Sequence, residues 1–278
     1  MIVLQIGAGG TGGYITEELV SILGSTNKEH VLAVIDGDIV EERNLERQAF
    51  FQRDVLKNKA EALVNRIETE DTENVHVFGV TDYIETWMEI VEIVTKLWEF
   101  YEEQTEVMIV CGADNNAVRH RIDLATKTLH ELDIFEHVMI VDSGNTEYTG
   151  ECLITILEQG VPYLENQLDY RLARLTGELE DRLTYGDFEM ACVESSESQP
   201  QNIGTNMLAG YTVLTSIIKW LTVREMESLS FNARTGYVTV INEVDQSEYI
   251  ELLETSPLKD SEYSQYQENK RSVVNFIQ

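Results

Sequence analysis

The stretch IVLQIGAGGTGGYITEELVSILG, residues 2–24, decides the fold of this chain. It opens with an unalternating apolar run, which is typical of a strand buried on both faces of a parallel sheet. The glycine-rich turn GAGGTGG follows directly, and the helical pattern after it carries Ile15, Leu19 and Leu23 on one face before Gly24 ends it. A strand, a glycine turn and a helix in this order predict the first unit of a nucleotide-binding α/β fold.

The glycine turn matches the pattern G-x-G-x-x-G through Gly7, Gly9 and Gly12. In such a turn the first glycine permits the tight bend, the second lets a phosphate approach the backbone, and the third lets the helix pack closely on the strand. Gly10 lies in the same loop, and Asp36 ends the second expected strand, where an acidic side chain meets ribose hydroxyls. A glycine turn that only packs is the alternative, and the motif by itself does not separate ATP from NAD.

Four more apolar runs of the strand type follow in the first 145 residues, and helical patterns separate them. The expected strands cover 2–7, 31–36, 75–80, 107–112 and 138–144, and the further expected helices cover about 58–67, 87–101 and 116–132. Strands that alternate with helices form a parallel sheet through right-handed crossovers. We therefore expect an α/β protein with a Rossmann-like, doubly wound, mainly parallel sheet and helices on both faces.

The second half of the chain departs from this alternation and extends the fold. Its patterns predict a strand at 152–159, a charged helix at about 164–182, a polar loop at 192–204, a long apolar helix at about 206–223 and a late strand at 238–241. A stripe on the long helix is expected to face the core or a dimer interface, namely Leu208, Tyr211, Leu214, Thr215 and Ile218. No Pro/Gly-rich linker interrupts the chain, so we expect one domain over 1–247, made of a nucleotide-binding half 1–145 and a second half 146–247, before a polar tail at 248–278.

The composition is strongly acidic, with 20 Lys and Arg against 50 Asp and Glu and a formal net charge of -30. Such a charge repels nucleic-acid phosphates and anionic lipid head groups, so we expect neither as a partner. The three cysteines, Cys111, Cys152 and Cys192, form no CxxC pair, which argues against a disulfide framework and a Cys-rich zinc site. The N-terminus has no signal-peptide pattern, and we expect a cytoplasmic protein.

One segment reverses this acidic balance. Between positions 43 and 59, the sequence RNLERQAFFQRDVLKNK holds five basic side chains and two acidic ones. Transfer of a nucleotidyl group requires such a local set of cations because negative charge spreads over the phosphates as pyrophosphate leaves, whereas hydride transfer does not. For Arg43 and Arg53 taken singly, we favour a solvated surface with ordinary ion pairs.

Several ordered positions in this region carry a family resemblance. The run D-x-D-x-V-E-x-x-N-L-x-R-Q from Asp36, the lysine that ends the basic segment, and the run CGADNNAVRHRID at 111–123 resemble the ThiF/MoeB superfamily. This is the ATP-dependent adenylating fold shared with ubiquitin-activating enzymes, and the resemblance covers about the first 145 residues. The later part, with Cys192, Gln201, Asn206 and FNARTGYVTVI, is most similar to ThiF-like proteins of PRTRC-type bacterial cassettes.

The resemblance implies an ATP site and roles for particular residues. Asp36 would bind the ribose hydroxyls, and Asp114 would hold Mg²⁺ between the α-phosphate and the pyrophosphate. Gln48 would order the loop that carries Arg47. The implied ATP-binding set is Gly7, Gly9, Gly10, Gly12, Asp36, Asp38, Asn44, Arg47, Gln48, Lys59 and Asp114. Within this set, Asn44, Arg47 and Lys59 would contact the phosphates, and Arg47, Lys59 and Asp114 would take part in catalysis.

The implied reaction is attack by a carboxylate on the α-phosphate of ATP. The carboxylate would typically be the C-terminal glycine of a small ubiquitin-like protein or peptide, and an acyl-adenylate and pyrophosphate would form. A carboxylate is already a nucleophile, so catalysis needs positioning and charge neutralisation rather than a general base. The resemblance also implies a homodimer.

The chain departs from the family pattern in three ways. Members usually carry an N-terminal arginine that reaches into the partner subunit's ATP site, and here that arginine is expected to be either missing or replaced from elsewhere in the chain. Many members bind a structural zinc through CxxC pairs, and we expect none here. Cys192 is the best candidate for the family's thioester cysteine, but Glu189, Glu194 and Glu197 oppose thiolate formation, so a structural cysteine is an equal alternative. A non-catalytic scaffold that binds ATP or a partner, and an NAD-dependent oxidoreductase, are the competing functional hypotheses.

Overall fold

The computed structural model describes residues 1–67, 73–101, 104–161 and 202–241. Within these ranges eight strands form one sheet in the order β3-β2-β1-β4-β5-β6-β7-β8. The strands are β1 (Ile2–Ile6), β2 (His30–Ile35), β3 (Val75–Val80), β4 (Glu106–Cys111), β5 (His137–Asn145), β6 (Thr149–Glu158), β7 (Leu229–Asn232) and β8 (Tyr237–Val240). Neighbours from β3 to β5 pair in parallel, and β6 to β8 extend the sheet in antiparallel fashion.

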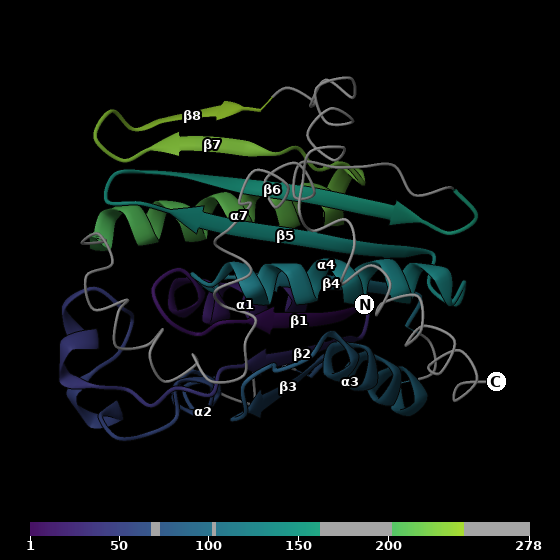
Figure 1. Cartoon of the computed structure of the whole chain (residues 1–278), viewed down its shortest axis with the longest axis horizontal. Helices are drawn as coiled ribbons and strands as arrows, with labels where there is room; N and C mark the ends of the chain where they lie inside the picture. Colours follow the sequence, from purple (N-terminus) through teal and green to yellow (C-terminus); the bar gives the residue numbers. More distant parts are fainter. Residues whose placement is uncertain (68–72, 102–103, 162–201, 242–278) are drawn as a thin grey trace.

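Helices cover both faces of this sheet (Figure 1). The α-helices in the described ranges are α1 (Thr16–Gly24), α2 (Lys59–Val64), α3 (Trp87–Phe100), α4 (Asn116–Glu131) and α7 (Ile203–Val223). Side chains of α1, α2 and α7 pack in one hydrophobic cluster, and those of α3 and α4 pack in a second. The prediction of a doubly wound, mainly parallel α/β sheet is therefore confirmed.

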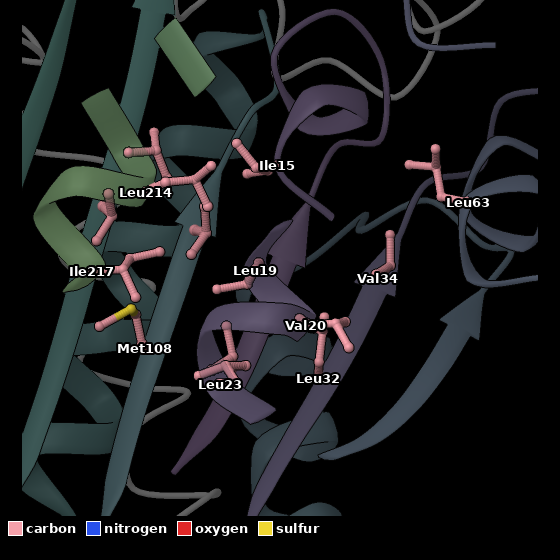
Figure 2. Packing of buried hydrophobic residues seen from close by; sticks show 14 of the residues in the cluster. Ile15, Leu19, Val20, Leu23, Leu32, Val34, Leu63, Met108, Leu214 and Ile217 are labelled. Atoms are coloured by element: carbon pink, nitrogen blue, oxygen red, sulfur yellow. The ribbon is translucent and has the colours of Figure 1, made fainter. Parts of the chain in front are cut away.

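The strand residues alternate between the two clusters. In β1, Val3 belongs to the first cluster, whereas Ile2 and Leu4 belong to the second. Both faces of the strand are thus buried, which explains why its sequence is apolar without alternation. Figure 2 shows part of the first cluster, in which α1 and α7 contribute labelled side chains that include Leu19 and Ile217.

The long helix α7 buries a different face from the predicted one. Leu214 is buried as expected, whereas Tyr211, Thr215 and Ile218 are exposed and do not face the core of this chain; that the stripe faces a dimer interface stays a prediction. The helix instead buries small polar side chains, and the hydroxyls of Thr212 and Ser216 donate hydrogen bonds to carbonyls one turn earlier in the same helix. Because the helix is apolar nearly all round and satisfies its inward hydroxyls internally, hydrophobicity alone does not fix which face is buried.

The C-terminal strands form a hairpin that the sequence patterns reveal only in part. The expected strand at 238–241 corresponds to β8, but its partner β7 has no counterpart among the expected strands. The charged helix expected at 164–182, most of the polar loop with Cys192, and the tail at 248–278 lie outside the described residues. None of the described helices is long and apolar enough to cross a lipid bilayer.

Candidate nucleotide-binding site

A cavity of about 380 Å³ opens at the carboxyl ends of the parallel strands. Its wall is formed by the segments that follow β1, β2, β4 and β5, together with part of the basic segment and the residues after β3. The strand order reverses between β1 and β4, because the chain leaves β1 toward β2 and later returns to β4 on the other side. Open α/β sheets bind ligands at this switch point.

The glycine turn after β1 lies on this wall, and two of its glycines are required by close packing. Gly7 has φ +97°, and a Cβ there would lie 2.8 Å from the backbone nitrogen of Ala113. A Cβ on Gly12 would lie 1.9 Å from the carbonyl oxygen of Gly7. Gly9 differs, because a Cβ there would meet no atom closer than 3.6 Å. The fold therefore demands glycine at Gly7 and Gly12, whereas Gly9 presents bare backbone to the cavity.

Asp36 ends β2 and points its carboxylate at the glycine turn. One oxygen accepts a hydrogen bond from the backbone N–H of Ala8 at 2.7 Å, and the other accepts from that of Asp38 at 2.8 Å. Burial raises the pKa of Asp36, although the positive charge of Lys59 and these two hydrogen bonds oppose the rise. Each oxygen keeps a further lone pair, so the carboxylate can still accept from ribose hydroxyls.

Lys59 begins α2 and is held against Asp38 on the cavity wall. The ammonium of Lys59, which is almost fully buried, lies 2.6 Å from the Asp38 carboxylate. The hydroxyl of Tyr83 donates to the other oxygen of Asp38 at 2.5 Å. Burial alone would raise the pKa of Asp38, but the charge and hydrogen bond of Lys59, helped by Tyr83, outweigh it and lower the pKa. Asp38 thus stays ionised and fixes both partners.

Arg47 is the other cation that the basic segment contributes to the wall. Among the described residues its guanidinium has no ion pair and no hydrogen bond. Arg43, Arg53 and Lys57 lie off the wall and contact side chains of their own segment, namely Glu41, Phe51 and Asp54 respectively. Two of the five cations counted in the sequence therefore face the cavity, and Arg47 is left to bind an anion.

A buried ion pair holds the segments after β4 and β5 together. The guanidinium of Arg119 in α4 donates to Asp142 in β5 at 2.7 Å, and both side chains are buried. Burial would lower the pKa of Arg119, but the charge of Asp142 outweighs it and raises the pKa. Arg119 also donates to the carbonyls of Ala113 and Ser143. These contacts fix the strand-end loop that presents Asp114.

Asp114 is exposed on the cavity wall just before α4. In the described part of the chain, no group of three or more His, Cys, Asp and Glu side chains is placed to hold a metal ion. A single carboxylate nevertheless suits Mg²⁺, which keeps several waters and shares the phosphates of its substrate. The residues present therefore fit a Mg²⁺ ion that enters together with a nucleotide.

The structure brings most of the predicted ATP-binding residues to this wall, but not all of them. Gln48 lies on the wall beside Gly9. Asn44 lies off it, because its buried side chain accepts from the backbone N–H of Glu41 at 2.8 Å in the 3-10 helix Glu42–Glu46. Cys192 lies outside the described residues. Burial raises the pKa of Cys111 and of Cys152 to about 12, so neither is a thiolate nucleophile.

The wall also contains residues that the sequence analysis did not single out, among them Tyr83 and Asn145. Tyr83 follows β3 and its ring covers Gly37, where a Cβ would come within 2.6 Å of the ring. Asn145 is the last residue of β5. Tyr83 follows β3, which lies beside β2, and Asn145 ends β5, which lies beside β4. Both residues can therefore be recognised as site candidates only when the order of the strands in the sheet is known.

The glycine turn, the acid that follows β2 and the guanidinium of Arg47, which has no partner among the described residues, all lie at the switch point of the sheet, where α/β folds bind nucleotides. The model of the ThiF family matches residues 1–247, and the chain belongs to the ThiF family. This confirms the resemblance seen in the basic segment and in the run after β4. No curated protein matches the chain significantly.

Solved structures of related fold include the MccB protein of E. coli and PaaA. The structure described as MccB with ATP has a TM-score of 0.56 and 16% identity, covering 87% of this chain and 63% of that one. MccB with AMPCPP and MccA has a TM-score of 0.58 and 15% identity, with coverage of 87% and 63%. PaaA has a TM-score of 0.55 and 17% identity, with coverage of 88% and 63%. The chain thus spans less than two thirds of these relatives, and the likeness shows a common fold.

Proposed function

We propose that the protein is an ATP-dependent adenylyltransferase that activates the C-terminal carboxylate of a small ubiquitin-like or sulfur-carrier-like protein or peptide. The observation that carries this proposal is the guanidinium of Arg47, which is unpaired among the described residues and lies on the same cavity wall as the backbone of the glycine turn. Membership of the ThiF family supports it, as does a fold shared with MccB, whose structures are described with ATP and with MccA.

The reaction is a displacement at phosphorus. A carboxylate oxygen of the acceptor forms a bond to the α-phosphorus, the bond from that phosphorus to the bridging oxygen breaks, and pyrophosphate leaves with the electron pair. No proton has to move, so the protein's tasks are binding, alignment and neutralisation of charge. Asp36 holds the ribose, the N–H groups of the glycine turn face the phosphates, and Arg47 and Lys59 stabilise the charge on them.

The charge of the wall explains why a metal ion is expected with the nucleotide. The cations on the wall are Arg47, Lys59 and Arg119, and the carboxylates are Asp36, Asp38, Asp82 and Asp114. Lys59 and Arg119 are already paired, with Asp38 and Asp142. The wall thus offers little free positive charge to a polyphosphate. Asp114 and the phosphates would hold a Mg²⁺ ion, which would supply the missing charge.

Exchange of labelled pyrophosphate into ATP tests the proposal, with Mg²⁺ present and synthetic peptides bearing free C-terminal carboxylates as acceptors. We expect exchange by the wild type, and a fall of roughly a hundredfold or more in Arg47→Ala, the size found when one transition-state donor is removed. Arg43→Ala is the matched control. It removes the same charge only four residues before Arg47, but from an exposed ion pair with Glu41. We expect its rate to stay within about twofold of the wild type.

The remaining outcomes separate the alternatives. Equal loss in both variants would mean that overall charge, rather than Arg47, governs the reaction and would overturn the site assignment. Tight ATP binding without exchange for any acceptor would select the scaffold hypothesis. Binding of NAD in preference to ATP would select the oxidoreductase. Peptides with an amidated C-terminus must give no exchange, because they lack the attacking carboxylate.

A further inference from the structure

Asn206 lies in the first turn of α7 and is fully buried, although the residues that it contacts are remote in sequence. Its amide nitrogen donates to the backbone carbonyl of Arg47 at 3.0 Å. Its amide oxygen accepts from the side chain of Asn145 at 2.9 Å. A Cβ on Gly10 would come within 2.8 Å of the same nitrogen, so the glycine turn rests on Asn206. One side chain thus joins three segments of the cavity wall.

The segment that carries Arg47 has little regular structure to hold it. It follows the 3-10 helix Glu42–Glu46, and within that turn the Arg47 N–H donates to the carbonyl of Asn44 at 3.2 Å. Short 3-10 turns have weak hydrogen-bond geometry and add little stability. The guanidinium itself has no partner in the described part of the chain. Among the described residues, the contact with Asn206 is the tertiary hydrogen bond made by the Arg47 backbone itself, and the next one along the segment is from Arg66 to the carbonyl of Ala49.

We propose that Asn206 is a positioning residue of the nucleotide site, which fastens the Arg47 backbone to the glycine turn so that the guanidinium faces the phosphates before ATP arrives. This inference rests on the proposed function for the identity of the ligand. Without Asn206 the loop samples other positions, and ATP binding has to order it. Loss of Asn206 then weakens ATP binding when the Arg47 guanidinium is present. It has no further effect on ATP binding when that guanidinium has been removed.

A purely structural role for the start of α7 is the competing explanation, and Asn202 provides a matched control for it. The Asn202 side chain caps α7, because its oxygen accepts from the N–H of Thr205 at 2.9 Å and its nitrogen donates to the carbonyl of Glu147. Among the described residues, the Asn202 side chain has no hydrogen bond to the Arg47 segment or to the glycine turn, and Asn202 does not line the cavity. Asn202→Ala therefore weakens the same helix end and leaves the Arg47 carbonyl paired.

The experiment compares Asn206→Ala, Asn202→Ala, Arg47→Ala and the double variant Asn206→Ala/Arg47→Ala by calorimetric titration with ATP and Mg²⁺, together with thermal unfolding. We expect about tenfold weaker ATP binding in Asn206→Ala, as for the loss of one buried hydrogen bond. Asn202→Ala should lower the unfolding temperature while its affinity stays within about twofold of the wild type. The double variant should bind ATP as Arg47→Ala does.

Wild-type affinity in Asn206→Ala, or a loss that adds in full to that of Arg47→Ala, would overturn the positioning role. If Asn206→Ala does not fold, Asn206→Asp is used in its place and judged by the same criteria. This variant keeps the shape of the side chain and the acceptor for Asn145, but it lacks the donor for the Arg47 carbonyl. Unchanged affinity in Arg47→Ala itself would instead reject the site of the proposed function. Failure of pyrophosphate exchange with intact coupling between the two residues would reject the activity and leave the positioning role standing.

Discussion

Replacing Gly9 by alanine separates nucleotide binding from folding. A Cβ at this position would lie 3.6 Å from Nε2 of Gln48, which is an ordinary van der Waals contact, and the φ of Gly9 lies outside the left-handed region. The added methyl therefore causes no clash and no backbone strain in the free protein. We expect the free energy of unfolding to change by no more than about 0.5 kcal/mol, with a small gain from the stiffer unfolded chain.

The same methyl occupies the space that a phosphate needs. Gly9 lies on the cavity wall, and a nucleotide in the predicted pose brings its phosphates against the backbone N–H groups of the turn. Loss of one hydrogen bond to a charged phosphate costs about 1.5–3 kcal/mol. ATP should thus bind roughly ten- to a hundredfold more weakly in Gly9→Ala.

Calorimetric titration with ATP and Mg²⁺, paired with urea unfolding, measures both effects in the same preparation. Gly12→Ala is the contrasting variant, since its Cβ would lie 1.9 Å from the carbonyl oxygen of Gly7, and we expect it to lose stability first. Wild-type ATP affinity in Gly9→Ala would refute the assignment of this turn to the phosphates. A fall in stability as large as that of Gly12→Ala would refute the packing argument.

Two further predictions concern ion pairs of the site. Arg119→Ala removes the ion-pair partner of the buried Asp142 and should lower the free energy of unfolding by about 3–5 kcal/mol in urea titrations. Lys96→Ala, in the exposed pair with Glu92 on α3, should cost less than about 1 kcal/mol, and equal losses would contradict this. The lowered pKa of Asp38 means that its contribution to stability is complete above about pH 4, the unfolded value, and is lost as the pH falls through the folded pKa. Asp38→Asn should therefore flatten the acid side of the stability–pH curve measured by urea unfolding, and an unchanged curve would show that the Lys59 contact contributes nothing.

The inner strands of the parallel half were predictable because they are buried on both faces, unlike the partly exposed edge strand β3. Strands β1, β2 and β4 appear in the sequence as continuous apolar runs, and the side chains of Asn58 and Asn115 cap the starts of α2 and α4. Strand β7 gave no such signal, since it has four residues and only Phe231 in it is buried. The buried face of α7 was misjudged for a related reason. Its inward residues include Thr212 and Ser216, which hydropathy assigns to the surface.

The site was predictable where its residues are close in sequence. Gly7, Gly12 and Asp36 follow from the spacing of one strand–turn–helix unit and the strand after it. The basic segment was recognisable as a whole, but its sequence did not show that Arg43 would pair with Glu41 while Arg47 would remain free. Arg43 lies within the 3-10 helix Glu42–Glu46, whereas Arg47 follows its end. The sequence of the segment does not show where this helix ends, and so it does not show which arginine faces the cavity.

Those contacts also change how the charge reversal in the basic segment is to be understood. The segment does not offer a broad positive surface to the nucleotide, because much of its charge serves to hold the loop. Asp54 is buried and accepts from Arg66 at 2.5 Å, which anchors one end of the segment, and the Asn206 hydrogen bond to the Arg47 carbonyl anchors the other. In a chain with a net charge of -30, the proposed recognition of a polyphosphate then depends on the Arg47 guanidinium, which has no partner among the described residues. Changes that loosen the loop should consequently impair ATP binding as much as removal of a cation, even where no charge is lost.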